Sequence, residues 1–165
     1  MQKRIFSFGG GVQSTAVMVL AAQGKVQYDA FVFANVGADS ENPATLEYIK
    51  NYTKPFAQEH GLNFVEVSRV RRGEPLTLLE FAMEENRTIP LPVYLESGAL
   101  ANRQCTIEFK IFIVDRWAKK QGITRIVTGL GISTDEIHRA RTTEWEMDKT
   151  TNIMKKREYP LIDLM

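Results

Sequence analysis

Three successive glycines, Gly9 to Gly11, separate a short apolar segment from a longer one, and this junction constrains the fold more than any other feature of the chain. Residues 3–8 are rich in apolar side chains and predict a strand. Residues 12–23 are almost continuously apolar, end before Gly24 and predict a buried helix with a glycine C-cap. Glycines at such a junction permit positive φ and a close approach of the main chain to another group. The sequence therefore begins with a predicted strand, a tight loop and a helix packed on a sheet.

The same alternation of strand and helix continues along the chain. Further strands are predicted over residues 28–34, 62–67, 124–128 and 153–158, and further helices over residues 42–61, 75–85 and 104–120. This order predicts a parallel sheet with right-handed crossovers. We expect one domain over residues 1–165 with an α/β fold: a three-layer, doubly wound, Rossmann-like parallel sheet of about five strands.

Prolines mark the irregular parts of this pattern. Asn42-Pro43 has the form of a helix start, with Asn42 as N-cap and proline at the first helical position. Pro55 lies inside the same predicted helix and is expected to kink or interrupt it, because proline lacks the amide hydrogen. Residues 87–102 contain two prolines and a glycine and show no periodicity, so we interpret them as a functional loop or lid.

Composition and charge exclude several classes of protein. The net charge of +1 does not indicate a nucleic-acid partner. Arg69, Arg71 and Arg72 are interpreted as a solvated loop; the alternative is that they contact phosphates. Cys105 is the only cysteine, which excludes an internal disulfide and a zinc site made of cysteines alone. The longest apolar stretch is too short to span a bilayer, and the first residues do not resemble a signal peptide. We expect a cytoplasmic protein with no membrane partner.

The glycine loop has the composition of a phosphate cradle. Free amides of the loop and of the following helix N-terminus would point at an anion, and the helix dipole favours negative charge there. It matches neither of two common phosphate loops, since no lysine follows the glycines and Asn35, not an acidic residue, ends the second strand. The alternative is a glycine-rich turn that only connects strand and helix.

Ligands of parallel sheets bind beyond the carboxyl ends of the strands, near the point where the strand order reverses. The segments that follow the predicted strands there are residues 7–14, 35–41, 68–72 and 129–139. The candidate nucleotide-binding residues are Ser7, Gly9, Gly10, Gly11, Gln13, Ser14, Thr15, Asn35, Gly37, Gly129, Gly131, Ser133 and Arg139.

Several segments resemble one known family. Ser-Phe-Gly-Gly-Gly-Val-Gln-Ser-Thr, residues 7–15, resembles the PP-loop (S-G-G-x-D-S) of the adenine nucleotide alpha hydrolase superfamily, and is closest to its phosphoadenosine phosphosulfate reductase-like branch. Four more segments resemble that branch in the same order: residues 33–46 after the second strand, R-x-C-T…K-I at 103–111, G-I-S-x-D-E…R at 131–139, and Y-P-L at 159–161. The resemblance covers nearly the whole chain.

Two features depart from the family pattern. Gln13 replaces the usual PP-loop aspartate, and the first serine of the motif aligns either with Gly9 or, offset, with Ser7. Relatives in this branch run on past the Y-P-L segment into a tail with further cysteines, which the present sequence does not include. We therefore expect no iron–sulfur cluster held by this chain alone.

The resemblance implies a function as well as a fold. It implies ATP binding and cleavage between the α and β phosphates with Mg²⁺, releasing pyrophosphate and adenylating an acceptor, as in sulfur transfer. The implied partners are an adenine nucleotide, an acceptor that the sequence does not identify, and a sulfur donor or partner protein. Two alternatives stay open: a sulfonucleotide reductase, and a non-catalytic or truncated nucleotide-binding module that needs a partner chain.

A few side chains are candidates for the chemistry itself. Arg103 and Lys110 match the R-x-C-T…K-I segment and would contact a substrate or the pyrophosphate; the alternative is a solvated helix face. Cys105, between them near a helix start, would be a sulfur-handling nucleophile or a cluster ligand; the alternative is a small buried residue. Asp135, with Glu136, would position Mg²⁺, or would be a first-turn helix carboxylate.

Overall fold

The computed structural model describes residues 1–84, 94, 96–99 and 104–164. Within them the main sheet has six strands in the order β3-β2-β1-β6-β8-β7. The strands of this sheet are β1 (Gln2–Phe8), β2 (Ala30–Asn35), β3 (Phe64–Ser68), β6 (Arg125–Leu130), β7 (Glu146–Asp148) and β8 (Ile153–Glu158). The first five in spatial order are parallel, and β7 pairs antiparallel with β8. The strand order reverses at β1, as in a doubly wound sheet.

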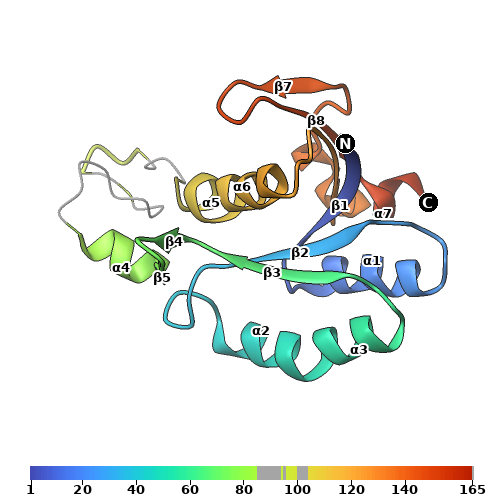
Figure 1. The fold of residues 1–165 in the computed structure, drawn as a ribbon, viewed down its shortest axis with the longest axis horizontal. Helices are drawn as coiled ribbons and strands as arrows, with labels where there is room; N and C mark the ends of the chain where they lie inside the picture. The colour runs from blue at the N-terminus through green and yellow to red at the C-terminus, as the bar shows by residue number, and fades with distance from the viewer. Residues whose placement is uncertain (85–93, 95, 100–103, 165) are drawn as a thin grey trace.

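Helices cover both faces of this sheet, so the expected three layers are confirmed (Figure 1). The helices α1 (Val12–Ala22), α2 (Pro43–Tyr48) and α3 (Lys54–Glu59) lie on one face, and α6 (Phe112–Lys120) lies on the other. Alternate residues of β1 serve the two layers, because successive side chains of a strand point to opposite faces. Phe6 and Phe8 pack against Val17 and Met18 of α1, and Ile5 belongs to the cluster that contains Ala118 of α6. The architecture is compatible with a Rossmann-like fold.

Pro55 is accommodated without ending its helix. The helices α2 and α3 form one continuous helix through a π-helical turn, η1 (Ile49–Thr53), directly before the proline. The Lys54 amide reaches back to the carbonyl of Ile49 there, which widens the helix where proline would otherwise meet the preceding turn. The expected interruption is thus a change of helix type. The start of α2 is as expected, since Asn42 Oδ1 accepts from the Ala44 amide with Pro43 at the first position.

Three parts of the sheet differ from expectation. The strand β7 was not predicted, because three residues with an exposed, charged sequence carry no periodic signal. Gly129 and Leu130, expected in a loop, are the last residues of β6. A separate hairpin of β4 (Val70–Arg71) and β5 (Glu74–Pro75) occupies the expected loop after β3.

The remaining helices are short or continuous with those above. The long helix on the second face runs from α5 (Gln104–Thr106) through a second π-helical turn, η2 (Ile107–Ile111), into α6. The others are α4 (Leu78–Met83), the 3₁₀ helix η3 (Thr134–Arg139) and α7 (Pro160–Asp163). Most of the expected lid, residues 87–102, lies outside the described residues. Among the described helices, none has both the length and the apolar character needed to cross a membrane.

Gly129 supplies a test of the sheet's packing. A Cβ atom at Gly129 would lie 2.4 Å from the hydroxyl oxygen of Tyr28, which packs over this position between β6 and the first layer of helices. We expect Gly129→Ala to lower the free energy of unfolding by about 1–3 kcal/mol, because the tyrosine must move in a filled core. Urea unfolding would measure it.

Gly9→Ala is the matched control, since a Cβ there meets no atom within 4 Å. Equal stability of Gly129→Ala and the wild type would contradict the packing described here.

Candidate functional site

The glycine loop leaves a set of amides without acceptors at the carboxyl end of β1. Gly11 is the N-cap of α1 and no side chain caps the helix. Within the described residues, no carbonyl or side chain accepts a hydrogen bond from the amides of Val12, Gln13 or Ser14. A Cβ at Gly9 or at Gly11 would meet no atom within 4 Å, so the loop faces open space. Free amides on an open helix N-terminus are what an anion binds.

Gly10 is required for a different reason than its neighbours. Its φ is +75°, and a Cβ there would lie 2.6 Å from Thr45 Cγ2 on α2. The loop therefore packs closely against the start of α2, and a side chain at this position is disfavoured by both strain and contact. This contact fixes the loop conformation that exposes the amides.

The hydroxyl groups expected in the cradle are directed at the loop itself. The carbonyl oxygen of Gly11 accepts from Ser14 Oγ at 2.8 Å and from both the amide and Oγ1 of Thr15 at 3.0 Å. These bonds hold the first turn of α1 in place. The donors that face outward are the amides, and Ser14 and Thr15 support them.

Gln13 connects the glycine loop to the loop that follows β6. Its Nε2 donates to Ser133 Oγ at 2.9 Å and to Glu136 Oε2 at 2.8 Å. Glu136 also forms an ion pair with Arg139, so that arginine is held at the rim. A Cβ at Gly131 would lie 3.3 Å from the Gln13 main chain, which shows how closely the two loops approach. Gln13 thus serves as a tether at the position where the family has aspartate.

Three other candidate residues have packing roles. Asn35 at the end of β2 donates to Glu66 Oε1 at 2.7 Å and accepts from the Gly37 amide at 2.9 Å, so both ends of its side chain have partners. Gly37 has φ +113°, and a Cβ there would lie 2.6 Å from Thr77 Cβ. Gly129 makes room for Tyr28. These positions carry glycine or asparagine for contacts inside the protein.

An open cavity of about 620 Å³ lies beside the loop on the other face of the sheet. Ser7 of β1 and Leu130 of β6 border it where these strands lead into their loops, and Lys110 borders it from η2. Its far wall is formed by β7 and by the outward parts of β8. The cavity therefore opens next to the carboxyl ends of β1 and β6, where the strand order reverses.

A cluster of charges that the sequence analysis missed forms part of this cavity. Lys155 of β8 donates to Asp115 Oδ2 at 2.5 Å and to Asp148 Oδ2 at 2.6 Å. Burial raises the pKa of the Asp115 carboxyl, and the adjacent Lys155 only partly offsets this. For Asp148, burial opposes ionisation, but bonds from Lys155 and from the Thr151 amide outweigh it and lower the pKa to about 2. The sequence signal was Asp115 directly after the apolar run 111–114.

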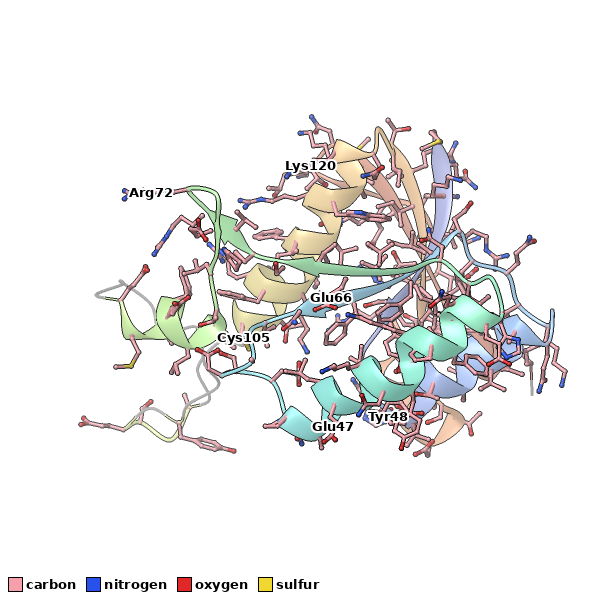
Figure 2. The ribbon with its side chains drawn as sticks, turned by 60° about the horizontal axis from the view of Figure 1, so that its bottom comes forward. Glu47, Tyr48, Glu66, Arg72, Cys105 and Lys120 are labelled. Atoms are coloured by element: carbon pink, nitrogen blue, oxygen red, sulfur yellow. The ribbon has the colours of Figure 1, made fainter. Side chains whose placement is uncertain are left out.

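The proposed chemical residues are not gathered in one place. Arg103 lies outside the described residues. Cys105 is a half-buried free thiol at the start of the long helix that ends at Lys120 (Figure 2), and it does not border the cavity. Lys110 borders the cavity and lies 4.0 Å from Glu41, with 49% of its side chain exposed. The structure thus brings Lys110 and Ser7 together at the cavity.

Asp135 lies at the rim beside the glycine loop. A hydrogen bond from Ser133 lowers the pKa of this exposed carboxyl. Within the part of the chain that the structure describes, no three His, Cys, Asp or Glu side chains are close enough together to hold a metal ion by themselves. A metal ion here would need oxygen atoms from a ligand.

Comparison with known proteins adds nothing to this description: no protein-family model matches the sequence, and no curated protein matches it. The family resemblance therefore rests on the motifs quoted above.

Gln13→Glu tests the tether between the two loops. The substitution replaces a donor by a carboxylate facing Glu136, so we expect the free energy of unfolding at pH 7 to fall by about 1–3 kcal/mol. Two facing carboxylates raise each other's pKa in the folded state, so the penalty is full near neutral pH and fades as the pH falls toward about 4. Urea unfolding at several pH values would measure it.

The compensating variant is Gln13→Glu with Glu136→Gln, which restores a donor and an acceptor across the same gap. Its stability should exceed that of Gln13→Glu alone, and equal stability of the two would contradict the described contact.

Asp148→Asn tests the charge cluster. Ionised Asp148 is favoured in the folded protein, because its pKa falls from 3.8 to about 2. Its contribution to stability is therefore complete above about pH 4 and is lost as the pH falls through 2. We expect Asp148→Asn to be less stable than the wild type at pH 6, with the difference shrinking between pH 4 and pH 2, as followed by thermal unfolding.

Glu47→Gln, on an exposed residue of α2, is the control and should change little at any pH. A pH-independent difference for Asp148→Asn would show that the asparagine disturbs packing and not charge.

Proposed function

We propose that this chain binds an adenine nucleotide with its phosphates on the Gly9–Gly11 loop and cleaves it between the α and β phosphates. The observation that carries the proposal is the group of amides from Val12 to Ser14, which lack acceptors among the described residues and face open space at the N-terminus of an eleven-residue helix. The likeness of residues 7–15 to the PP-loop supports a phosphate as the anion. The helix dipole adds to the attraction.

The proposed chemistry places charge where these donors lie. An acceptor oxygen attacks the α phosphorus, the bond to the bridging oxygen breaks, and pyrophosphate leaves. Amides fixed by the Gly10 and Gly131 contacts would stabilise charge on the leaving group without reorganising, which is the general advantage of preorganised donors. Arg139, held at the rim by Glu136, would add a positive charge to the same site.

Mg²⁺ would bind between the phosphates and the rim. In proteins Mg²⁺ is often held by one or two carboxylates together with substrate phosphates. Glu136 is engaged by Gln13 and Arg139, whereas Asp135 is exposed and has no ion pair among the described residues, so Asp135 is the proposed protein ligand. The ion would share the charge of the leaving pyrophosphate.

The acceptor would enter from the cavity beside Ser7. That cavity of about 620 Å³ lies within the size range of small-molecule sites, and it combines apolar walls with the charged groups of Lys110 and Lys155. The glycine loop and the cavity lie on either side of the end of β1, so an acceptor there would be next to the α phosphate. A sulfur or nitrogen nucleophile would then displace the adenylyl group.

Gly11→Asp separates a phosphate cradle from a connecting turn. An aspartate at this N-cap accepts from the first-turn amides, so we expect stability to rise by a few tenths of a kcal/mol over glycine. The same carboxylate occupies the phosphate position and repels phosphate, so ATP binding should be lost. Calorimetric titration with ATP, AMP and 3′-phosphoadenosine 5′-phosphosulfate, with and without Mg²⁺, would measure binding, and a pyrophosphate assay the cleavage.

Gln23→Glu is the matched control, because it adds the same charge at the other end of α1 and should leave ATP binding intact. Undiminished ATP binding by Gly11→Asp would refute the cradle. Preference for the sulfonucleotide, with thiol-dependent sulfite release, would replace ATP cleavage by a reductase reaction.

A further inference from the structure

A second hollow lies on the edge of the protein, away from the glycine loop. It has a volume of about 590 Å³ and lies between the end of β3, the start of β4 and the outer side of α6. Four basic side chains border it, Arg69, Arg116, Lys119 and Lys120, together with Trp117, and no acidic side chain does. We call these five residues and the space they border the basic hollow. In Figure 2 it lies on the side where Lys120 and Arg72 are labelled.

Three of the four cations in the basic hollow have no counterion in the part of the chain that the structure describes. Arg69 is used inside the protein, since it pairs with Glu108 at 2.9 Å and its guanidinium lies over the rings of Phe81 and Phe109. Within the described residues, Arg116, Lys119 and Lys120 form no ion pair. The nearest acidic residue along the helix, Asp115, is buried and bound to Lys155. The hollow therefore keeps three uncompensated positive charges although the whole chain carries only +1.

Helix stability explains only part of this arrangement. Lys119 and Lys120 lie in the last turn of α6, where cations favour the helix dipole. Arg116 lies in the middle of that helix and gains nothing from the dipole. Three cations of one helix that border the same hollow without a counterion among the described residues indicate an anionic ligand with more than one charged group.

Trp117 contributes an aromatic side chain to the lining of the hollow. The indole packs on one side against the core cluster under α6, and the side chain is half-buried where it borders the hollow. Val67, Val70 and Ile113 extend the apolar surface around it. An acidic peptide would contact the cations but would not require an aromatic side chain beside them. Bases of a single strand stack on aromatic side chains while a basic groove follows the phosphates.

We infer that the basic hollow binds a single-stranded segment of nucleic acid, with a base against Trp117 and flanking phosphates on Arg116, Lys119 and Lys120. This site does not depend on the nucleotide bound at the glycine loop, because the two lie on different elements and share no residue. The net charge of +1 does not indicate such a site, because it averages over the whole surface.

Anisotropy of a labelled oligo(dT) and oligo(U) of about 12 nucleotides, titrated with the full chain at several salt concentrations, tests the inference. We expect Arg116→Gln with Lys119→Gln to weaken binding about tenfold or more. The slope of log affinity against log salt should become less steep by about 1.4, since each lost single-strand phosphate contact removes about 0.7. Lys25→Gln with Lys50→Gln, on exposed lysines of the opposite layer, removes the same charge and should change neither slope nor affinity by as much.

Tryptophan fluorescence tests whether a base lies against Trp117. In a Trp145→Phe background the remaining indole is Trp117, and we expect oligonucleotide binding to quench it, whereas inorganic polyphosphate should bind weakly and without quenching. Absence of oligonucleotide binding at low salt, an equal loss in the two double variants, or binding without quenching would each overturn the inference. So would equal binding of polyphosphate. Gly11→Asp should bind oligonucleotide as the wild type does, so failure of the cradle and failure of this site are distinguishable.

Discussion

The contact between the first turn of α1 and the loop after β6 positions the two loops that follow the central strands β1 and β6. Gly131 lies against the Gln13 main chain, and the Gln13 side chain binds Ser133 and Glu136 across the same gap. Both loops begin where neighbouring parallel strands end. A larger residue at position 131 would separate them, and the amides of the glycine loop would lose the frame that orients them. The arrangement of the proposed phosphate site and of the cavity beside it follows from this one close approach.

The helix and sheet layers of the fold could be predicted from the sequence, because apolar periodicity and glycine positions reflect local structure. Residues 153–158 were predicted as a strand with the bounds that β8 has, and Asn42-Pro43 begins α2 as expected. The misses have physical reasons. The strand β7 forms because β8 offers it an edge, which no local pattern of three residues can show. The π-helical turn before Pro55 is a response of the helix to a residue that cannot donate, and propensity alone predicts a break there.

For the candidate site, the strand–glycine loop–helix junction was predictable, because its three parts are contiguous in the chain. The contacts of its single residues were not. Gly37 and Gly129 are glycines because Thr77 and Tyr28 lie against them, and Asn35 binds Glu66, contacts that join distant segments. The Asp115–Lys155 pair and the basic hollow likewise form from residues far apart in sequence, and net charge conceals the second of them.

The position of β1 in the sheet has a consequence for how the chain folds as it is made. This strand precedes its partners in the chain yet lies in the centre of the sheet: Ile5 pairs with Ala30 of β2, but Gln2 pairs with Arg125 of β6, far later in the sequence. Until then the main-chain N–H and C=O groups along one edge of β1 are unpaired, next to the apolar side chains of Ile5 and Phe6. Such an edge pairs readily with strands of other chains. Pairing across so long a separation is also slow. Correct folding of this sheet therefore requires that the open edge of β1 stays free of wrong partners until β6 is available.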